Sequence, residues 1–340
     1  ASGRVMRGGD QGMPMIKRVL VAALAFAASA CLACGAEAAD RLRIAIQKTG
    51  TASWELEVIK ARGLDKAANL DIETTELAST EAGKIALEGG AADMIVGDWL
   101  WVARERALGD KLLFTPYSSA LGAVMAPKDS PVHAVADLAG RSIGVAGGPI
   151  DKSWLLLRAA ALGAGLDLAK GTRPSYGAPP LIAEKLVQGE TETALEFWNF
   201  CADLEGRGFR RAIEMADVEK ALGASGPVAM TGYVFSEAFA ASHKDALRRY
   251  FAAAAEARKI LAQDPSAWAP IKARLRLKDD AALAVYRQRY LEGVPKRTVA
   301  EEAADARILY RRLAEIGGQE LVGKATELDT GLFYDPAASE

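Results

Sequence analysis

The residues best suited to bind a ligand lie in the stretch Gly147–Trp154. The small and apolar residues just before it predict a short buried strand, and its two glycines predict a sharp turn. Pro149 suits the first turn of a helix, because its missing N–H costs nothing there. The start of a helix offers unpaired backbone N–H groups and the positive end of the helix dipole. Because Lys152 and Ser153 fall in that first turn, the stretch predicts an anion-binding site.

A related pattern occurs about a hundred residues earlier in the chain. There a predicted strand over residues 43–46 precedes a turn, and Ser53-Trp54 corresponds to Ser153-Trp154 with one residue inserted. A second set of residues matches another at a constant offset of 99 positions: Leu87, Gly90, Asp93, Ile95, Val96 and Trp99 correspond to Leu186, Gly189, Glu192, Ala194, Leu195 and Trp198. Two matching segments in the same order predict two similar α/β lobes.

Strands that alternate with helices would position these turns. In the first lobe we expect strands over residues 42–47, 71–77, 93–96 and 111–117, with helices over 54–61, 80–90 and 99–108. In the second lobe we expect strands over 142–146, 172–175, 193–197 and 211–215, with helices over 150–162, 179–187 and 199–205. This alternation is typical of an α/β fold with parallel strands and crossover helices. A strand over 229–235 would return the chain to the first lobe, and helices follow over 244–262, 265–275, 279–292 and 298–316.

Composition narrows the class of protein. The 340 residues suit roughly two domains, and 50% hydrophobic with 25% charged residues is ordinary for a protein with a sizeable core. The formal net charge of −2 and the scattered basic residues argue against a nucleic-acid partner. Cys31 and Cys34 fall in the N-terminal segment, which we expect to be cleaved off. Cys201 then remains alone, and we expect it to be a small core residue. With only His133 and His243 besides it, we expect neither a metal site nor a Cys–His nucleophile.

The N-terminal segment has the pattern of a secretory signal peptide. Lys17-Arg18 precedes the apolar run 19–33, and the small residues 36–38 form a cleavage pattern, so the mature protein would begin near Asp40 in the periplasm. Leu32–Gly35 fits a lipoprotein processing site poorly, and we expect no lipid anchor at Cys34. The expected boundaries are these: 1–39 for an upstream remnant and the signal peptide, 40–117 for the first part of lobe 1, 118–226 for lobe 2, 227–328 for the second part of lobe 1, and 329–340 for a tail.

Three further segments carry a resemblance to a known class of proteins. They are the Gly-Gly-Ala-Ala-Asp stretch at 89–93, Pro131 with the Ala-Asp-Leu-Ala-Gly-Arg stretch at 136–141, and the helix end at 163–167. From about Arg41 to Gly317 the chain resembles periplasmic solute-binding proteins of ABC importers, within the group that binds sulfonates, nitrate and thiamine precursors. The resemblance implies the type II architecture: two lobes, each a sheet flanked by helices, close over one ligand and present it to a permease. We expect a monomer that binds its ligand without turnover.

Mapped onto this sequence, the resemblance places the ligand in a cleft lined by the turns of both lobes. The expected ligand-binding residues are Thr51, Ser53, Trp54, Trp99, Trp101, Ser118, Gly147, Gly148, Asp151, Lys152, Ser153, Trp154, Tyr176, Glu196, Trp198 and Asn199. The tryptophans depart from the usual pattern, because five of the six in the chain fall in these turns.

The tryptophans favour a planar ligand, since large aromatic side chains offer flat and rigid contact area. The stretch Gly147–Leu157 also resembles binding proteins that accompany bacterial oxidation systems dependent on pyrroloquinoline quinone (PQQ). PQQ is planar, aromatic and carries three carboxylates. We therefore expect PQQ or a close relative as the bound ligand, with no cofactor needed for turnover. Trp99 and Trp198 would stack on its two faces, while Lys152 and the N–H groups of 148–153 hold its oxygens.

Three alternatives remain open. The same helix start would serve an aliphatic sulfonate or another small anion, with the tryptophans only shaping the cleft. A thiamine-precursor enzyme or binder is a second alternative, although neither histidine falls in the mapped turns. A quaternary-amine binder is the third, because aromatic side chains together with Asp98, Asp151 and Glu196 would suit a cation.

Overall fold

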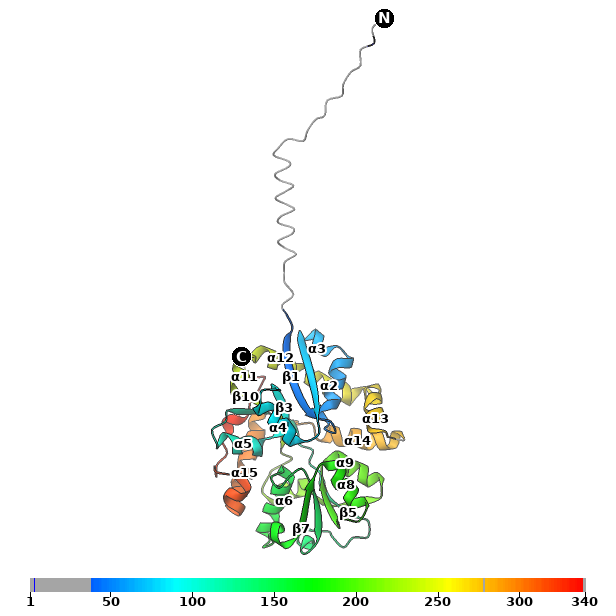
Figure 1. Ribbon diagram of the computed structural model, residues 1–340, viewed down its shortest axis with the longest axis vertical. Helices are drawn as coiled ribbons and strands as arrows, with labels where there is room; N and C mark the ends of the chain where they lie inside the picture. Colours follow the sequence, from blue (N-terminus) through cyan, green and yellow to red (C-terminus); the bar gives the residue numbers. More distant parts are fainter. Residues whose placement is uncertain (1–2, 4–37, 278, 339–340) are drawn as a thin grey trace. The chain divides into compact units, whose positions relative to one another are not determined.

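The computed structural model describes residue 3 and residues 38–277 and 279–338. The predicted signal peptide, with Cys31 and Cys34, lies almost entirely outside the described residues. The described residues from Asp40 onward form one compact unit that contains two sheets. Figure 1 shows the two sheets one above the other, the first mostly in blue and cyan and the second in green.

The first sheet has five strands in the order β2-β1-β3-β10-β4. Its strands are β1 (Asp40–Gln47), β2 (Leu70–Leu77), β3 (Met94–Asp98), β4 (Leu112–Ser118) and β10 (Thr231–Ser236). β1 pairs in parallel with β2 and β3, whereas β10 runs antiparallel between β3 and β4. β10 lies inside this sheet, close to the strand expected over 229–235, so the chain returns to the first sheet there.

The second sheet repeats this plan in the order β7-β6-β8-β5-β9. Its strands are β5 (Ala123–Pro127), β6 (Ser142–Ala146), β7 (Arg173–Gly177), β8 (Thr193–Glu196) and β9 (Phe209–Glu214). β6 pairs in parallel with β7 and β8, and β5 runs antiparallel between β8 and β9. Each sheet therefore contains one antiparallel strand contributed where the chain crosses between sheets, so the sheets are mixed and not wholly parallel.

Helices flank both sheets and continue after β10. The helices associated with the first sheet are α2 (Ala52–Ala61), α3 (Leu64–Ala67), α4 (Thr80–Glu88) and α5 (Trp99–Arg106). Those of the second are α6 (Lys152–Gly163), α7 (Leu168–Gly171), α8 (Pro179–Val187), α9 (Trp198–Gly206) and α10 (Met215–Ala221). The C-terminal region adds α11 (Glu237–Ser242), α12 (Lys244–Gln263), α13 (Ala269–Leu275), α14 (Asp280–Glu292) and α15 (Val299–Val322). Among the described residues, no helix is both long and apolar enough to span a membrane.

The sequence repeat corresponds to equivalent structural anchors in the two sheets. The carboxylate of Asp93 accepts the backbone N–H of Arg43 at 2.8 Å, and that of Glu192 accepts the backbone N–H of Ser142 at 2.8 Å. The first bond joins the middle of β1 to Asp93, and the second joins the start of β6 to Glu192. Two glycines with positive φ follow the helices before these acids: Gly90 and Gly189. The sequence repeat therefore corresponds to the same strand-helix-strand unit, which occurs once in each sheet.

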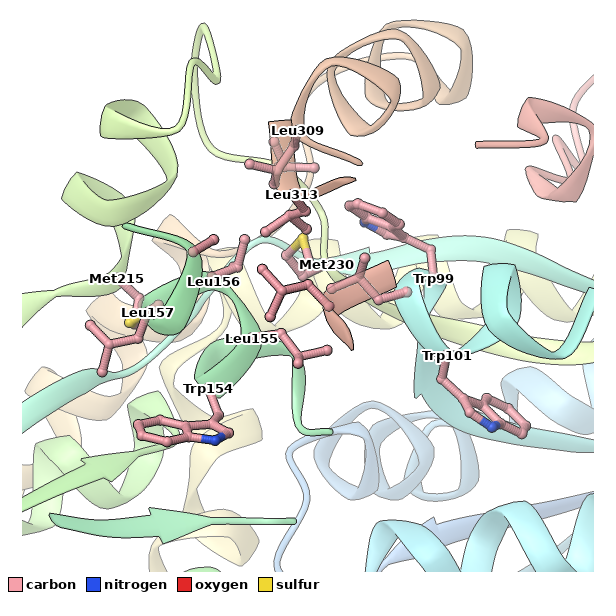
Figure 2. Packing of buried hydrophobic residues seen from close by; sticks show 14 of the residues in the cluster. Trp99, Trp101, Trp154, Leu155, Leu156, Leu157, Met215, Met230, Leu309 and Leu313 are labelled. Atoms are coloured by element: carbon pink, nitrogen blue, oxygen red, sulfur yellow. The ribbon is translucent and has the colours of Figure 1, made fainter. Parts of the chain in front are cut away.

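Helix α15 packs against both lobes and joins their cores. Its residues Leu309 and Leu313 belong to the same hydrophobic cluster as Trp99 of α5 and the run Leu155–Leu157 of α6. Figure 2 shows these side chains gathered with Met230. The amphipathic pattern of α15, with apolar side chains three and four residues apart, thus serves packing between the lobes.

Three details differ from the sequence-based expectations. Strand β5 was not expected, because its five residues are all small or apolar and carry no alternating pattern. Helix α6 begins at Lys152 with Asp151 as its N-cap, three residues later than the expected first turn at Pro149. Met215 begins α10 and does not end the preceding strand, which closes at Glu214.

Candidate ligand-binding site

A cavity of about 120 Å³ lies where the carboxyl ends of strands from both sheets meet. The first lobe contributes the turn between β1 and α2, the start of α4, the end of β3 and the end of β4. The second lobe contributes the turn between β6 and α6 and the turn between β8 and α9. This is the edge at which open α/β sheets hold ligands, since the loops that follow the strands converge there.

Five helices, α2, α4, α5, α6 and α9, begin at this cavity, and three of them are capped by their own side chains. Ser79 Oγ accepts the Ala82 N–H at 3.2 Å at the start of α4. Asp98 Oδ1 accepts the Trp101 N–H at 2.8 Å at the start of α5, and Asp151 Oδ1 accepts the Ser153 N–H at 2.9 Å at the start of α6. In α5 and α6 the capping carboxylate already accepts an N–H group of the first turn and offsets the positive end of the helix dipole. The expected anion site at the start of α6 is therefore occupied by the protein's own Asp151.

The starts of α2 and α9 have no side-chain cap. Within the described residues, the backbone N–H groups of Thr51 and Ala52 in α2, and of Trp198 and Asn199 in α9, make no hydrogen bond. All four residues line the cavity, two from each lobe. Because unpaired N–H groups at a helix start attract negative charge, these two helices offer the cavity an anion-binding pair of N-termini.

One lysine from each lobe also lines the cavity. Lys84 Nζ of α4 lies 5.1 Å from the ring centre of Trp101, and Lys152 Nζ of α6 lies 4.9 Å from that of Phe197. Each ammonium is also 3.9 Å from a neighbouring carboxylate, on Glu81 and Asp151 respectively. The aromatic faces hold the two cations against the walls of the cavity.

Burial shifts the pKa of two acidic side chains of the second lobe near the site, Asp151 and Glu196. Burial raises the pKa of Asp151, Lys152 counteracts this, and the like charge of Asp98 adds to it. Burial raises the pKa of Glu196 well above its usual range, the backbone N–H of Phe197 counteracts this only in part, and the like charge of Asp151 adds to it. Glu196 does not line the cavity. Its burial therefore favours the neutral, protonated form.

The structure brings half of the expected residues to the cavity. Those that line it are Thr51, Ser118, Gly147, Asp151, Lys152, Ser153, Trp198 and Asn199. Those that do not are Ser53, Trp54, Trp99, Trp101, Gly148, Trp154, Tyr176 and Glu196. Ser53 points back along its own turn, where its Oγ donates to the Gly50 carbonyl at 2.8 Å.

The tryptophans account for most of this difference. Trp99 is fully buried and packs against Tyr310 and Phe333, so it cannot stack on a ligand opposite Trp198. The rings of Trp54 and Trp154 are likewise at most 2% exposed. A tryptophan in the first turn of a helix can point either into the loop cluster or back into the core, and burial of its large apolar ring favours the core. The expected aromatic sandwich is corrected accordingly.

Several lining residues were not expected from the sequence. The start of α4 contributes Ser79, Thr80, Glu81 and Lys84, and the end of β4 contributes Tyr117. Ser79 and Thr80 precede the apolar positions of α4, and Ser and Thr are typical N-cap residues. Since α4 follows a parallel strand, its start must lie at the same edge as the starts of α2 and α5, and this relation could have placed it in the site. Among the described residues, no group of three or more His, Cys, Asp or Glu side chains is arranged to hold a metal ion.

Comparisons with known proteins agree with this geometry. The family model described as NMT1/THI5 like matches residues 57–267. No curated protein sequence matches the chain.

Solved structures match over most of the chain. The periplasmic aliphatic sulphonate binding protein SsuA from Escherichia coli is 21% identical, with a TM-score of 0.67 over 86% of this chain and 91% of its own. The alkanesulfonate-binding protein SsuA from Xanthomonas axonopodis pv. citri, bound to MOPS, is 20% identical, with a TM-score of 0.66 over 88% and 99%. A ligand-binding component of an ABC-type import system from Staphylococcus aureus, with zinc bound, is 12% identical, with a TM-score of 0.64 over 88% and 97%. At these identities the matches show that the chain has the fold of periplasmic binding proteins.

Proposed function

Because this chain belongs to the NMT1/THI5-like family, we propose that it is a periplasmic binding protein that captures a small organic anion and delivers it to an ABC importer. The observation that carries the proposal is the pair of uncapped helix starts, α2 from one lobe and α9 from the other, at one cavity. Their four unpaired N–H groups would hold the oxygens of an anion, with Lys84 and Lys152 on the walls. The protein would act as a monomer in the periplasm and release its ligand unchanged.

An aliphatic sulfonate is the ligand class that the cavity favours. A volume of about 120 Å³ corresponds to roughly eight to twelve water-sized spheres, since about 10–15 Å³ holds one water. A short alkanesulfonate fits within that volume. Its three equivalent oxygens match N–H donors arriving from two directions. Two of the similar structures are described as sulfonate-binding proteins, which supports the same class.

PQQ is the second candidate ligand, favoured by the three aromatic side chains that line the cavity, Tyr117, Phe197 and Trp198. Its support is weaker than the sequence indicated, because Trp99 lies in the core and cannot form the second face of an aromatic sandwich with Trp198. A thiamine-precursor enzyme, the alternative open from the sequence, would need a reactive His or Cys in the cavity. Burial raises the pKa of the Cys201 thiol to about 12, and neither His133 nor His243 lines the cavity.

Isothermal titration calorimetry with ethanesulfonate, PQQ and choline tests the proposal. We expect saturable one-to-one binding of ethanesulfonate that outcompetes the other two. Thr51→Asp would place a carboxylate at the start of α2 and should bind ethanesulfonate about tenfold more weakly than the neutral, isosteric Thr51→Asn, because the added charge competes for the same N–H groups. Absence of saturable ethanesulfonate binding, or equal affinities of the two variants, would reject an anion site at α2.

A further inference from the structure

One cavity-lining residue, Trp198, also packs into the opposite lobe. Its indole ring lies 5.7 Å from that of Trp54 at an interplanar angle of 87°, and 6.3 Å from the ring of Tyr286. Trp198 begins α9 of the second lobe, whereas Trp54 lies on α2 and Tyr286 on α14, which pack with the first sheet. Trp198 and its neighbour Ala202 join a hydrophobic cluster whose other members all belong to the first lobe or the C-terminal helices.

The receiving surface is a rigid aromatic socket, which we define as Trp54, Trp268, Tyr286 and Tyr290. Trp54 lies 5.7 Å from both Trp268 and Tyr290, and Trp268 lies 5.6 Å from Tyr290, mostly edge to face. Such contacts add to the gain from burying the rings and define their orientation.

The buried carboxylate of Glu55 supports the socket by accepting a hydrogen bond from one of its members, Tyr290. Tyr290 Oη donates to Glu55 Oε1 at 2.7 Å, and Arg258 donates to Glu55 Oε2 at 3.1 Å. Glu55 lies in the first turn of α2, directly behind the uncapped start that faces the cavity. The same network therefore fixes both the socket and one of the two helix starts of the site.

Polar contacts bridge the lobes on either side of Trp198. The Asn199 side-chain amide donates to the Thr49 carbonyl at 3.2 Å. Arg289 of α14 lies 3.8 Å from Glu205 of α9. In Figure 1, α9 lies beside α14 at the boundary between the lobes.

We propose that α9 is a latch, in which docking of Trp198 into the aromatic socket positions the start of α9 for the ligand. The N–H groups of Trp198 and Asn199 face the ligand only while the indole is seated against Trp54 and Tyr286. Ligand binding and docking of the indole therefore stabilise each other, although Tyr286 does not line the cavity. This inference rests on the proposed function for its ligand, but docking itself does not depend on which ligand binds.

Tyr286→Leu tests the latch, because it removes a ring of the socket without changing the cavity wall. The protein is labelled with 5-fluorotryptophan, the Trp198 signal is assigned with Trp198→Phe, and a soluble gadolinium chelate reports the exposure of each indole. In the ligand-free protein we expect Tyr286→Leu to raise the paramagnetic relaxation of Trp198 at least threefold. Trp99 and Trp154, packed within the core, should keep theirs. Unchanged Trp198 relaxation would overturn the latch.

Affinity supplies the second readout. Tyr286→Leu should weaken ethanesulfonate binding about tenfold, and Tyr286→Phe, which keeps the ring, should restore it. Phe333→Ala serves as the matched control, since it removes an aromatic ring that packs against Trp99 and Phe114 away from the cavity. Equal losses in Tyr286→Leu and Phe333→Ala would show general destabilisation and overturn the latch. If the unaltered protein does not bind ethanesulfonate, the proposed function fails, while the relaxation measurement still decides the latch.

Discussion

The two lobes place equivalent tryptophans in different surroundings. Trp99 begins α5 in the first lobe and Trp198 begins α9 in the second, at matching positions of the repeat. Trp99 is fully buried beneath Tyr310 of α15 and Phe333, while Trp198 lines the cavity and contacts the opposite lobe. The chain that follows β10 explains the asymmetry, because its helices cover the first lobe and build the aromatic socket there. A repeated unit thus keeps its topology while its side chains take separate roles.

Replacing each tryptophan in turn should separate these roles. Trp99→Ala should lower the free energy of unfolding by about 3–5 kcal/mol, because the ring leaves a cavity in the shared core. Trp198→Ala should cost less, about 1–3 kcal/mol, because its contacts lie between the lobes. Urea denaturation measures both.

Ethanesulfonate affinity should respond in the opposite order. We expect at least a tenfold loss in Trp198→Ala and nearly unchanged affinity in Trp99→Ala, measured by calorimetry on the folded variants. The reverse order would show that Trp99, and not Trp198, faces the ligand.

Buried glutamates give a second comparison between the lobes. Glu55 in the first lobe is hydrogen-bonded to Tyr290 and Arg258, while Glu196 in the second has no side-chain hydrogen-bond partner among the described residues. Burial raises the pKa of both, and the partners of Glu55 counteract the shift. Because the folded-state pKa of Glu196 lies above the unfolded value near 4.5, its burial costs stability as pH rises through that value.

Glu196→Gln removes this titration. The variant should gain stability over the unaltered protein as pH rises from about 4.5, by up to roughly 1.4 kcal/mol per pH unit, until the folded-state pKa is passed. Glu55→Gln should lose stability at pH 7, because the Arg258 guanidinium is left without its partner. Urea denaturation between pH 4 and 8 checks both. A pH-independent difference for Glu196→Gln would show that the folded-state pKa of Glu196 lies near its unfolded value.

The turn before α6 provides a third comparison, between neighbouring glycines. Gly147 has a φ of 91°, and an added Cβ would lie 2.9 Å from the Asp151 carboxylate. Gly148 has open space around such a Cβ. Gly147→Ala should therefore cost about 1–2 kcal/mol of stability, since L side chains disfavour this backbone region, and should disturb the Asp151 cap. Gly148→Ala should be nearly neutral in the same thermal-unfolding measurement. Similar losses for both would show that the left-handed backbone at Gly147 does not set the cost.

The two lysines are expected to have the smallest effects. Lys84→Met in the first lobe and Lys152→Met in the second should each weaken ethanesulfonate binding about two- to fivefold, because partly hydrated charges contribute modestly. Lys170→Met, at an exposed position with 87% side-chain exposure, is the control. A loss at only one position would show that one lobe holds the anion alone. Higher ionic strength should reduce the effect of both substitutions.

Much of the fold could be predicted from local patterns. The Pro179 signal placed α8 at its observed start, and the apolar run before Gly147 predicted β6. Strand β5 could not be recognised in the same way, because its stability comes from pairing between β8 and β9, which are distant in sequence. Cavity-lining residues could be predicted from the sequence only where a turn at the end of a strand carries the residue to the cavity, as for Thr51, Gly147 and Asn199.

The sequence by itself determined the two-lobe α/β plan, because strand and helix periodicity, the glycine turns and the acids of the repeat are local signals. It also determined that the helix starts would gather at one edge of each sheet. Only the tertiary structure decided which starts remain open to a ligand. Asp151 turns back to cap α6, and packing against the C-terminal helices draws Trp54 and Trp99 into the core while leaving Trp198 at the cleft. Whether each of these side chains is buried or exposed depends on the neighbours that pack against it, and the tertiary structure alone determines those neighbours.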